Sequence, residues 1–419
     1  MKKIIIQGGK KLHGTISISG SKNASLPILA SSILFDEKVV LENVPIVQDI
    51  ITMVKLLETL GKKITIKKNT IIILSKSKTK SFADYKLVKT MRAGILVIGP
   101  ILAKLKKAKV SLPGGCAIGA RPVDIHLDFL SKAGYANKVL NGYVESKLIK
   151  KRKNISYKFK KLSVGATETA ILNSVISDKS VILKNIATEP EIIDLINFLK
   201  TAGAKIIFKS KRSILITGVQ KLNGLDYRVM PDRIEAGTYI MASVITKSSL
   251  VLKNIRYQDI KNIISIFKGS GTKFEEINNN GLKIIPKLMK PMKIKTVPYP
   301  GFPTDMQAQL MSVLTLTKGS SQITEDIFEN RFMHVLELKR MGAIIEIEHN
   351  KAKINGIKNL SGAEVMATDL RASVSLVLAG LAAKGKTTIN RVYHLDRGYE
   401  NLVQKLKKCG ANIRVTNVR

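Results

Sequence analysis

The chain repeats one pattern six times, and this repeat limits the possible folds more than any other feature of its 419 residues. Three copies are plain, because a Leu-x-Asn-Val/Ile segment recurs at 41–44, 183–186 and 252–255, and each is followed by a helix-like stretch that ends in Gly. Three weaker copies end in the same way. The terminal glycines lie 68 to 73 residues apart, and they are Gly61, Gly134, Gly203, Gly271, Gly342 and Gly410. A fixed period of this kind indicates one supersecondary unit that is used repeatedly.

Each copy predicts a strand, a helix that ends at its glycine, and further strands. Glycine just past a helix adopts the left-handed conformation without steric cost. A second helix is predicted before the Leu-x-Asn segment, at 24–34, 93–105, 306–316 and 372–383. Apolar residues surround these second helices on all sides, so we expect them to be buried.

The sequence therefore predicts an α/β repeat protein of six units of about 70 residues each. A chain of 419 residues is too long for one hydrophobic core, and six units divide naturally into two domains of three. The strand predicted at residues 3–7 precedes the first copy. We expect it to complete the last copy, which would bring the chain ends together.

Charged residues recur at equivalent helix starts. Arg121 and Arg397 both lie 13 residues before a terminal glycine. At the start of the second helix the copies carry Lys22-Asn23, Arg92, Arg233, Asp305, and Asp369 with Arg371. An aspartate there is an ordinary N-cap, but a cation opposes the helix dipole and costs stability unless an anion compensates it. Helix N-termini also bind anions directly. If equivalent ends face one another, these cations line one anion-binding cleft.

Composition excludes several classes of protein. No apolar run is long enough to cross a bilayer, and the first apolar run is shorter than expected for a secretion signal. With only Cys116 and Cys409, a disulfide framework is excluded and a reducing compartment is favoured. The net charge of +39 is spread over the whole chain, so we do not expect nucleic acid as the main partner. The five histidines show no metal-ligand spacing, so no metal is expected.

The segment 113–122 places a thiol in a glycine-rich loop, Pro-Gly-Gly-Cys, five residues before Arg121 and Pro122. Pro122 suits the first turn of a helix. A thiol near an arginine and a helix N-terminus is expected to have a lowered pKa and to be reactive. The alternative is a glycine turn around a small buried cysteine. The loop by itself leaves both interpretations open.

Taken together, these segments resemble the enolpyruvyl transferases, and among them the UDP-N-acetylglucosamine 1-carboxyvinyltransferase family. The resemblance covers essentially the whole chain, and its motifs lie at 20–24, 90–93, 113–124, 163–167, 303–307, 368–372 and 395–400. The related shikimate-pathway enolpyruvyl transferases share the six-unit architecture but lack the cysteine loop. The Pro-Gly-Gly-Cys segment thus distinguishes the two families.

The resemblance implies a two-domain inside-out α/β barrel with three repeats in each domain. Residues 22–229 would form the first lobe, residues 1–21 and 230–419 the second, with the active site in the cleft between them. The implied reaction moves the enolpyruvyl group of phosphoenolpyruvate to the 3′-hydroxyl of UDP-N-acetylglucosamine and releases phosphate. This reaction is the first committed step of peptidoglycan synthesis. The resemblance implies an enzyme that needs no cofactor and no metal. We expect a cytoplasmic protein, and nothing in the sequence requires more than a monomer.

The resemblance also implies roles for individual residues. Lys22, Arg121 and Arg397 would hold phosphoenolpyruvate, since its phosphate and carboxylate need fixed cations. The expected contacts to the nucleotide sugar are Asn23, Arg92, Arg121, Pro122, Val123, Asp124, Ile125, Lys161, Leu162, Ser163, Val164, Asp305 and Ile327. Asp369 and Arg371 would support the closed site.

In the implied mechanism, Cys116 is either the proton donor to phosphoenolpyruvate or an assistant to product release. A thiol acts as a general acid only if its protonated form is populated, and bound phosphate would raise its pKa again. Asp305 is the expected base for the sugar hydroxyl. Two other functions remain open at this point: an enolpyruvyl transferase that acts on shikimate 3-phosphate, and a non-catalytic basic scaffold that binds nucleic acid.

Overall fold

The computed structural model describes residues 2–114, 123–287 and 289–417. It divides into two compact units. The N-terminal unit consists of the described residues of 20–230, and the C-terminal unit consists of the described residues of 2–19 and 231–417. The chain passes between the units at Ser19–Gly20 and returns at Met230–Pro231. Cys116, Arg121 and Pro122 lie outside the described residues.

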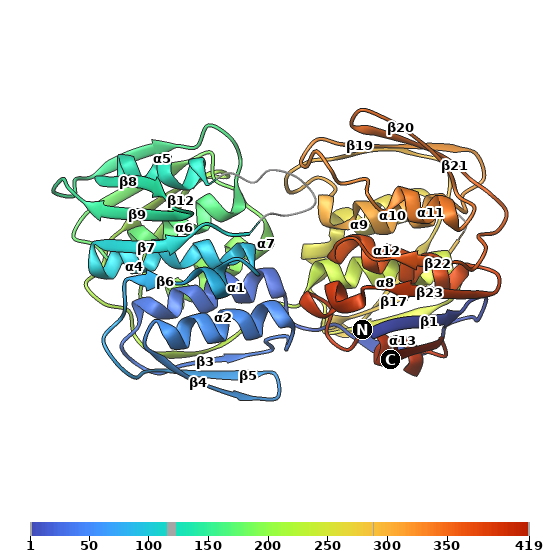
Figure 1. The fold of residues 1–419 in the computed structure, drawn as a ribbon, viewed down its shortest axis with the longest axis horizontal. Helices are drawn as coiled ribbons and strands as arrows, with labels where there is room; N and C mark the ends of the chain where they lie inside the picture. The colour runs from blue at the N-terminus through green and yellow to red at the C-terminus, as the bar shows by residue number, and fades with distance from the viewer. Residues whose placement is uncertain (1, 115–122, 288, 418–419) are drawn as a thin grey trace. The chain divides into compact units, whose positions relative to one another are not determined.

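Three four-stranded sheets form the outside of the N-terminal unit, and helices lie between them (Figure 1). In spatial order the sheets are β14 (Leu225–Arg228), β3 (Val39–Glu42), β5 (Thr70–Ser75) and β4 (Lys62–Lys67); β6 (Phe82–Ala83), β7 (Lys107–Ser111), β9 (Tyr143–Leu148) and β8 (Tyr135–Leu140); and β10 (Ile155–Lys158), β11 (Ser180–Lys184), β13 (Ser213–Thr217) and β12 (Lys205–Ser210). The helices are α1 (Lys22–Ser31), η1 (Ser32–Leu34), α2 (Gln48–Thr59), α3 (Tyr85–Val88), η2 (Arg92–Val97), α4 (Ile98–Leu105), α5 (Asp124–Lys132), α6 (Val164–Ser174) and α7 (Pro190–Thr201).

The C-terminal unit repeats this plan. Its sheets are β2 (Thr15–Ser17), β15 (Leu250–Lys253), β17 (Gly281–Ile285) and β16 (Lys273–Ile277); β18 (Lys293–Thr296), β19 (Ser320–Glu325), β21 (Lys351–Asn355) and β20 (Ile344–Glu348); and β22 (Glu364–Met366), β23 (Lys386–Asn390), β1 (Lys2–Gln7) and β24 (Asn412–Asn417). Its helices are α8 (Arg233–Ile245), α9 (Tyr257–Gly269), η3 (Asn278–Asn280), η4 (Thr304–Met306), α10 (Gln307–Leu314), α11 (Val335–Arg340), α12 (Leu370–Ala382), η5 (Val392–Arg397) and α13 (Leu402–Lys408).

All six sheets follow one topology. An edge strand pairs in parallel with a central strand, and two antiparallel strands complete the sheet; these two strands form a hairpin in five sheets, and in the sixth they are β1 and β24. The α/β repeat fold with three repeats in each half is thereby confirmed. The prediction for the first strand is also confirmed, because β1 pairs with β23 and β24 of the last repeat.

The terminal glycines explain where the helices end. Each of the six has a positive φ, between 90° and 108°, which other residues adopt only with strain. The backbone N–H of Gly61, for example, donates to the carbonyl of Glu58 in the last turn of α2. The glycine therefore closes its helix and turns the chain into the next strand, as the repeat predicts.

The asparagine of the Leu-x-Asn segment fixes the parallel edge strand to its neighbour. Asn43, Asn185 and Asn254 have φ values of 55° to 57°. Their side-chain amides donate to the carbonyls of Val229, Phe159 and Ile18, at 2.8, 2.9 and 2.6 Å. Each acceptor lies one residue beyond the end of an edge strand. The motif thus holds together two segments that are far apart in sequence.

The predicted second helices are present and buried. In α1, nine of ten residues are buried, and all residues of α10 are buried; the same holds for α8, for which no range was predicted. The remaining two predictions correspond to η2 with α4 and to α12. These inner helices pack against one another in each unit, with α10 against both α8 and α12. The first turns of the inner helices therefore gather the polar residues that the repeat singles out.

Candidate active site

Lys22 is the first residue of α1, directly after the N-cap Ser21, whose hydroxyl accepts from Ala24 N. Its ammonium lies 3.1 Å from a carboxylate oxygen of Asp49 in the first turn of α2. Both side chains are nearly buried, with 11% and 6% of their surface exposed. The sequence predicted that a cation at this helix start needs a bound anion to compensate its charge. In the structure, the Asp49 carboxylate supplies a negative charge from within the protein. The spacing of 27 residues gives no local signal for this pair.

Arg92 begins the 3-10 helix η2 and is half-buried. It acts electrostatically on His126 of α5, a buried residue whose pKa falls to about 4, first because of burial and second because of the Arg92 charge. The Nδ1 of His126 lies 2.9 Å from the hydroxyl of Thr169 in α6. His126 is therefore neutral at physiological pH and links α5 to α6.

Residues 161–164, which are predicted to contact the nucleotide sugar, lead into α6 and include its first residue. The Ser163 hydroxyl caps this helix by accepting from Ala166 N at 3.3 Å. Lys161 and Val164 are exposed, and Leu162 is half-buried. Gly165 follows, and a Cβ there would lie 3.1 Å from the His126 ring. The glycine thus lets the first turn of α6 approach α5 closely.

The other predicted contacts in the N-terminal unit lie at the starts of α1 and α5 and range from buried to exposed. Asn23 is half-buried in the first turn of α1. Val123 is the buried N-cap of α5, Asp124 is its exposed first residue, and Ile125 is half-buried. Asp124 suits that position because a carboxylate stabilises a helix N-terminus.

Asp305 of the C-terminal unit is held between two arginines. One carboxylate oxygen accepts from Arg371 at 2.7 Å and the other accepts from Arg331 at 2.9 Å. The guanidinium side chains are only 6% and 3% exposed, whereas Asp305 is 29% exposed. The two arginines therefore fix both carboxylate oxygens, while the side chain stays partly exposed.

Arg371, in the first turn of α12, contacts both Asp305 and the buried hydroxyl of Tyr399. Although burial opposes its charge, Asp305 raises the pKa of Arg371 above its usual value. Its other terminal nitrogen donates to the hydroxyl of Tyr399 at 3.2 Å. That hydroxyl also lies 2.9 Å from Thr238 of α8 and accepts from Gln309 of α10 at 3.2 Å. One buried phenol therefore connects α8, α10 and α12.

Asp369 is the N-cap of α12, and one of its carboxylate oxygens accepts from the backbone N–H groups of Arg371 and Ala372. The sequence expectation that an aspartate at this position caps a helix is confirmed. Ile327 lies in a turn organised by Glu325, which accepts from the N–H groups of Ile327 and Phe328. Glu325 also accepts from the Thr304 hydroxyl at 2.8 Å, which ties this turn to the segment that carries Asp305.

Arg397 does not occupy the start of α13, so the position predicted for it from the repeat is wrong. It ends the 3-10 helix η5, five residues before α13 begins at Leu402. In the preceding copy, the residue 13 positions before Gly342 is Glu329, and it likewise precedes α11 by six residues. The counting fails because these two copies replace the first turns of their helices with irregular turns. Burial and the nearby Arg397 lower the pKa of His394.

Sequence reasoning overlooked Asp49, Arg331, Thr238 and Gln309, and it noted Tyr399 only as part of a motif. Their partners are distant in sequence, by 161 residues for Thr238 and Tyr399. The one signal available was the density of polar residues at the starts of otherwise apolar helices. Cys409, by contrast, is buried and burial raises its pKa, which confirms that it is packed in the core. Among the described residues, no group of three or more metal-ligating side chains occurs.

Residues 6–406 match the family described as EPSP synthase (3-phosphoshikimate 1-carboxyvinyltransferase). The chain is 54% identical over 417 residues to the UDP-N-acetylglucosamine 1-carboxyvinyltransferase of Pelagibacter ubique (strain HTCC1062), and the alignment covers 100% of both chains. The chain belongs to the UDP-N-acetylglucosamine 1-carboxyvinyltransferase family. The family member from Endomicrobium trichonymphae is 49% identical, with 99% of both chains covered.

Solved structures of this family's wider fold agree with the repeat architecture. The enolpyruvyl transferase NikO from Streptomyces tendae superimposes with a TM-score of 0.90 at 22% identity, covering 100% of this chain and 99% of that one. An EPSP synthase from Acinetobacter baumannii superimposes with a TM-score of 0.76 at 16% identity, covering 100% of both chains. As a member of the family, the protein is a transferase. In the part of the chain that is described, no helix has the length and apolar character to span a membrane.

Proposed function

We propose that this transferase moves the enolpyruvyl group of phosphoenolpyruvate to the 3′-hydroxyl of UDP-N-acetylglucosamine in peptidoglycan synthesis. The observation that carries the proposal is the full-length identity of 54% to a UDP-N-acetylglucosamine 1-carboxyvinyltransferase. The residues that this chemistry needs are present in the sequence: Lys22, Cys116, Arg121, Asp305 and Arg397. The shikimate 3-phosphate and nucleic-acid alternatives are less consistent with the names of the relatives and with the cysteine loop.

The donor carries a phosphate and a carboxylate, so its binding requires fixed positive charge. In the proposal, Lys22, Arg121 and Arg397 supply this charge from residues of both units. Lys22 is well suited because its partner Asp49 and its burial keep the ammonium in one position. Charge-assisted hydrogen bonds from such preorganised cations are about twice as strong as neutral ones.

The proposed reaction is an addition followed by an elimination. A proton, from Cys116 in one form of the proposal, adds to C3 of phosphoenolpyruvate and leaves a cationic centre at C2. The sugar 3′-hydroxyl adds to C2 and loses its proton to Asp305. The resulting tetrahedral ketal then loses phosphate from C2 and a proton from C3, which restores the double bond in the product. Protons and bonds balance without a cofactor.

Asp305 fits the role of base geometrically, because its two arginine partners fix both oxygens while the side chain stays 29% exposed. A carboxylate with two guanidinium partners is a weak base, so removal of water on closure is needed to strengthen it. We assign Arg331, Arg371 and Asp369 to positioning: the arginines hold Asp305, and Asp369 fixes the start of the helix that carries Arg371.

The nucleotide sugar would contact the starts of α1, α5 and α6 through Asn23, Arg92, the 121–125 segment and the 161–164 segment. We further propose that the protein works in the cytoplasm as a monomer, with the division between lobes near residues 21 and 230. The two cysteines in the chain are consistent with a reducing compartment.

A phosphate-release assay with two acceptors tests the function. Purified protein is given phosphoenolpyruvate with either UDP-N-acetylglucosamine or shikimate 3-phosphate. The proposal expects release only with the nucleotide sugar, together with vinyl proton signals of the enolpyruvyl ether in the product. Release only with shikimate 3-phosphate, or with neither acceptor, would overturn it. A Lys22→Met variant is expected to lose phosphate release, and a Lys63→Met variant at an exposed strand position is the matched control.

A further inference from the structure

Tyr399 lies two residues after η5, and only 4% of its surface is exposed. Its hydroxyl oxygen accepts from two different donors, the guanidinium of Arg371 and the side-chain amide of Gln309, each at 3.2 Å. Both donors have a further contact, and in each case that contact is with Asp305. The phenol is therefore connected to the proposed base by two separate routes.

One route leads to the carboxylate of Asp305 and the other leads to its main chain. The second terminal nitrogen of Arg371 donates to a carboxylate oxygen at 2.7 Å. The amide nitrogen of Gln309 donates to the backbone carbonyl of Asp305 at 2.9 Å. This nitrogen carries two hydrogens, so it can donate to the carbonyl and to the phenol together. The two groups that fix the side chain and the backbone of one residue thus share the same acceptor, the Tyr399 hydroxyl.

Thr238 of α8 determines the direction of the phenol proton. Its hydroxyl lies 2.9 Å from the carbonyl of Ile234 and 2.9 Å from the Tyr399 hydroxyl. A carbonyl can only accept, so the Thr238 proton goes to Ile234 and the Tyr399 proton goes to Thr238. The Gln309 amide also approaches the Thr238 hydroxyl, at the longer distance of 3.3 Å. The lone pairs of the phenol oxygen are thereby left for Arg371 and Gln309.

Burial keeps the phenol protonated. Desolvation raises the pKa of Tyr399 above its usual value, although the charge of Arg371 acts in the opposite direction. The hydroxyl therefore has a proton to donate to Thr238 at neutral pH. The Tyr399 ring also lies close to the guanidinium of Arg371, at 5.6 Å from its central carbon to the ring centroid. A phenylalanine at this position would keep the ring contact and lose only the hydroxyl.

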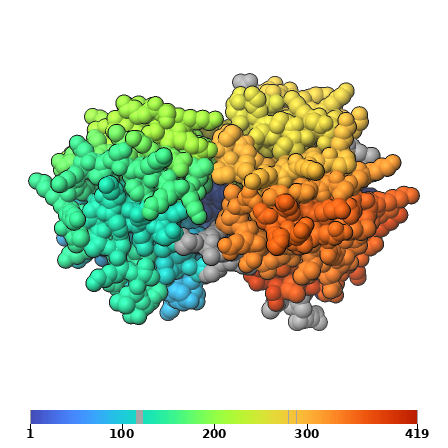
Figure 2. Space-filling view, turned by 90° about the horizontal axis from the view of Figure 1, so that it is seen from above, coloured from blue at the N-terminus to red at the C-terminus, as the bar shows by residue number. Residues whose placement is uncertain are grey.

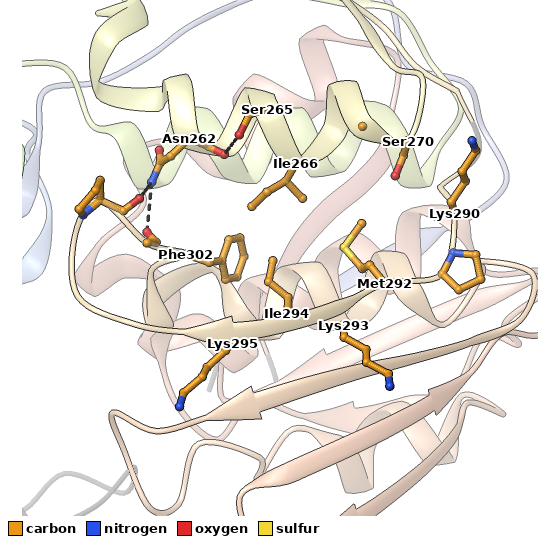
Figure 3. A pocket seen from close by; sticks show the side chains of 14 residues that line it. Asn262, Ser265, Ile266, Ser270, Lys290, Met292, Lys293, Ile294, Lys295 and Phe302 are labelled. Carbon is orange, nitrogen blue, oxygen red and sulfur yellow. Dashed lines mark hydrogen bonds between the residues drawn. The ribbon is translucent and has the colours of Figure 1, made fainter.

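The main chain that leads to Asp305 has separate support from α9. The side-chain amide of Asn262 donates to the carbonyls of Pro300 and Gly301, at 2.9 and 3.1 Å. These three residues line a cavity of about 620 Å³ between α9 and β18 (Figure 3). This part of the unit, coloured yellow to orange, reaches the molecular surface (Figure 2). Loss of the phenol hydroxyl is therefore expected to leave this segment folded and to affect the position of Asp305.

We propose that Tyr399 is a positioning residue for Asp305. Its hydroxyl holds Arg371 and Gln309, and these two residues in turn fix the carboxylate and the main chain of the base. The inference rests on the proposed function, in which Asp305 accepts the proton of the sugar hydroxyl. A base must lie within hydrogen-bond reach of the proton that it removes, and a small displacement lowers the rate steeply. Because Tyr399 is buried, it acts through its two partners and not on the substrate.

Tyr399→Phe tests this role, since it removes the hydroxyl and keeps the ring. Phosphate release is measured over a range of concentrations of phosphoenolpyruvate and UDP-N-acetylglucosamine. We expect kcat to fall about tenfold, because a buried guanidinium next to the base loses a hydrogen bond. KM for phosphoenolpyruvate is expected to change less than about twofold, because the alignment of the base matters in the transition state and not in donor binding.

Tyr239→Phe is the matched control. Tyr239 in α8 is fully buried, and its hydroxyl has no hydrogen-bond partner among the described residues. The control removes the same single oxygen atom from the core of the same unit, and we expect it to leave kcat unchanged. The thermal midpoint is recorded for both variants, so that a loss of folded protein is distinguished from a loss of rate.

A double-mutant cycle distinguishes positioning from general packing. Gln309→Met keeps the length of the side chain and removes the amide that joins Tyr399 to the main chain of Asp305. If the phenol acts through this amide, Tyr399→Phe lowers kcat by a smaller factor in the Gln309→Met protein than in the native chain. Equal factors in the two proteins mean that the two residues act independently, and this result overturns the proposal.

The acceptor of the phenol proton provides a second test. Thr238→Ser keeps a hydroxyl at this position and is expected to retain most of kcat. Thr238→Val has nearly the same shape but no acceptor, and it is expected to lower kcat. Equal kcat values for the serine and valine variants contradict the proton arrangement on which the proposal depends.

Unchanged kcat in Tyr399→Phe, or an equal loss in Tyr239→Phe, also overturns the inference. These results differ from a failure of the proposed function, which would appear as no phosphate release from the native protein with UDP-N-acetylglucosamine. In that case Asp305 accepts no proton from this sugar, and the positioning role of Tyr399 is refuted together with the function.

Discussion

Replacement of Asp305 by asparagine is expected to destabilise the C-terminal unit as well as to remove a catalytic group. The change keeps the shape of the side chain but removes its negative charge. Arg331 and Arg371, which are 3% and 6% exposed, then face each other across a neutral amide. An amide also offers only one acceptor oxygen, so one of the two guanidinium groups loses its hydrogen bond to residue 305.

The size of the effect follows from burial. Removal of one partner from a buried ion pair costs about 3–5 kcal/mol. Asp305 is 29% exposed, so water screens the remaining charges and reduces this cost. We expect a loss of about 2–3 kcal/mol in the free energy of unfolding of this unit. For a unit of this size, about 1 kcal/mol corresponds to 2–4 °C, so the thermal midpoint should fall by roughly 4–12 °C.

Differential scanning calorimetry provides the measurement, and Asp326→Asn is the matched control. Asp326 pairs with Lys295, but both side chains are more exposed, at 32% and 57%, and surface pairs contribute only about 0–1 kcal/mol. Added sulfate should recover part of the midpoint of Asp305→Asn, because an anion can replace the missing charge, whereas phosphate release should not recover. If Asp305→Asn and Asp326→Asn shift the midpoint equally, the dependence on burial is refuted.

Two further predictions concern Cys116 and His126. Cys116→Ser is expected to abolish covalent labelling by the epoxide fosfomycin, as judged by intact-protein mass spectrometry; an adduct that persists elsewhere on the chain contradicts the assignment of the reactive thiol. For His126, the unfolded chain binds a proton near pH 6.5, whereas burial and Arg92 lower the folded pKa to about 4. Its contribution is therefore complete above pH 6.5 and is lost as pH falls toward 4, at up to about 1.4 kcal/mol per pH unit. His126→Gln should make urea midpoints less sensitive to pH in this window, and an unchanged slope would contradict burial of a neutral imidazole as the cause.

The sequence by itself determined the local rules of this protein. The terminal glycines end helices because only glycine adopts positive φ there without strain, and the apolar helices are buried because no side of them is polar. The repeat also predicted where β1 lies. This strand precedes the first copy, so it was expected to complete the last one, and it pairs with β23 and β24.

Only the tertiary structure decided which polar residues are partners. Asp305 meets Arg331 and Arg371 at distances of 26 and 66 residues along the chain, and Lys22 meets Asp49 across two helices. Charge pairs of this kind depend on how whole helices pack against one another. The periodicity of a single sequence does not predict that packing. The repeat also assigned Arg397 to the start of a helix by counting from Gly410. The structure places it elsewhere, because the segment before α13 departs from the repeat.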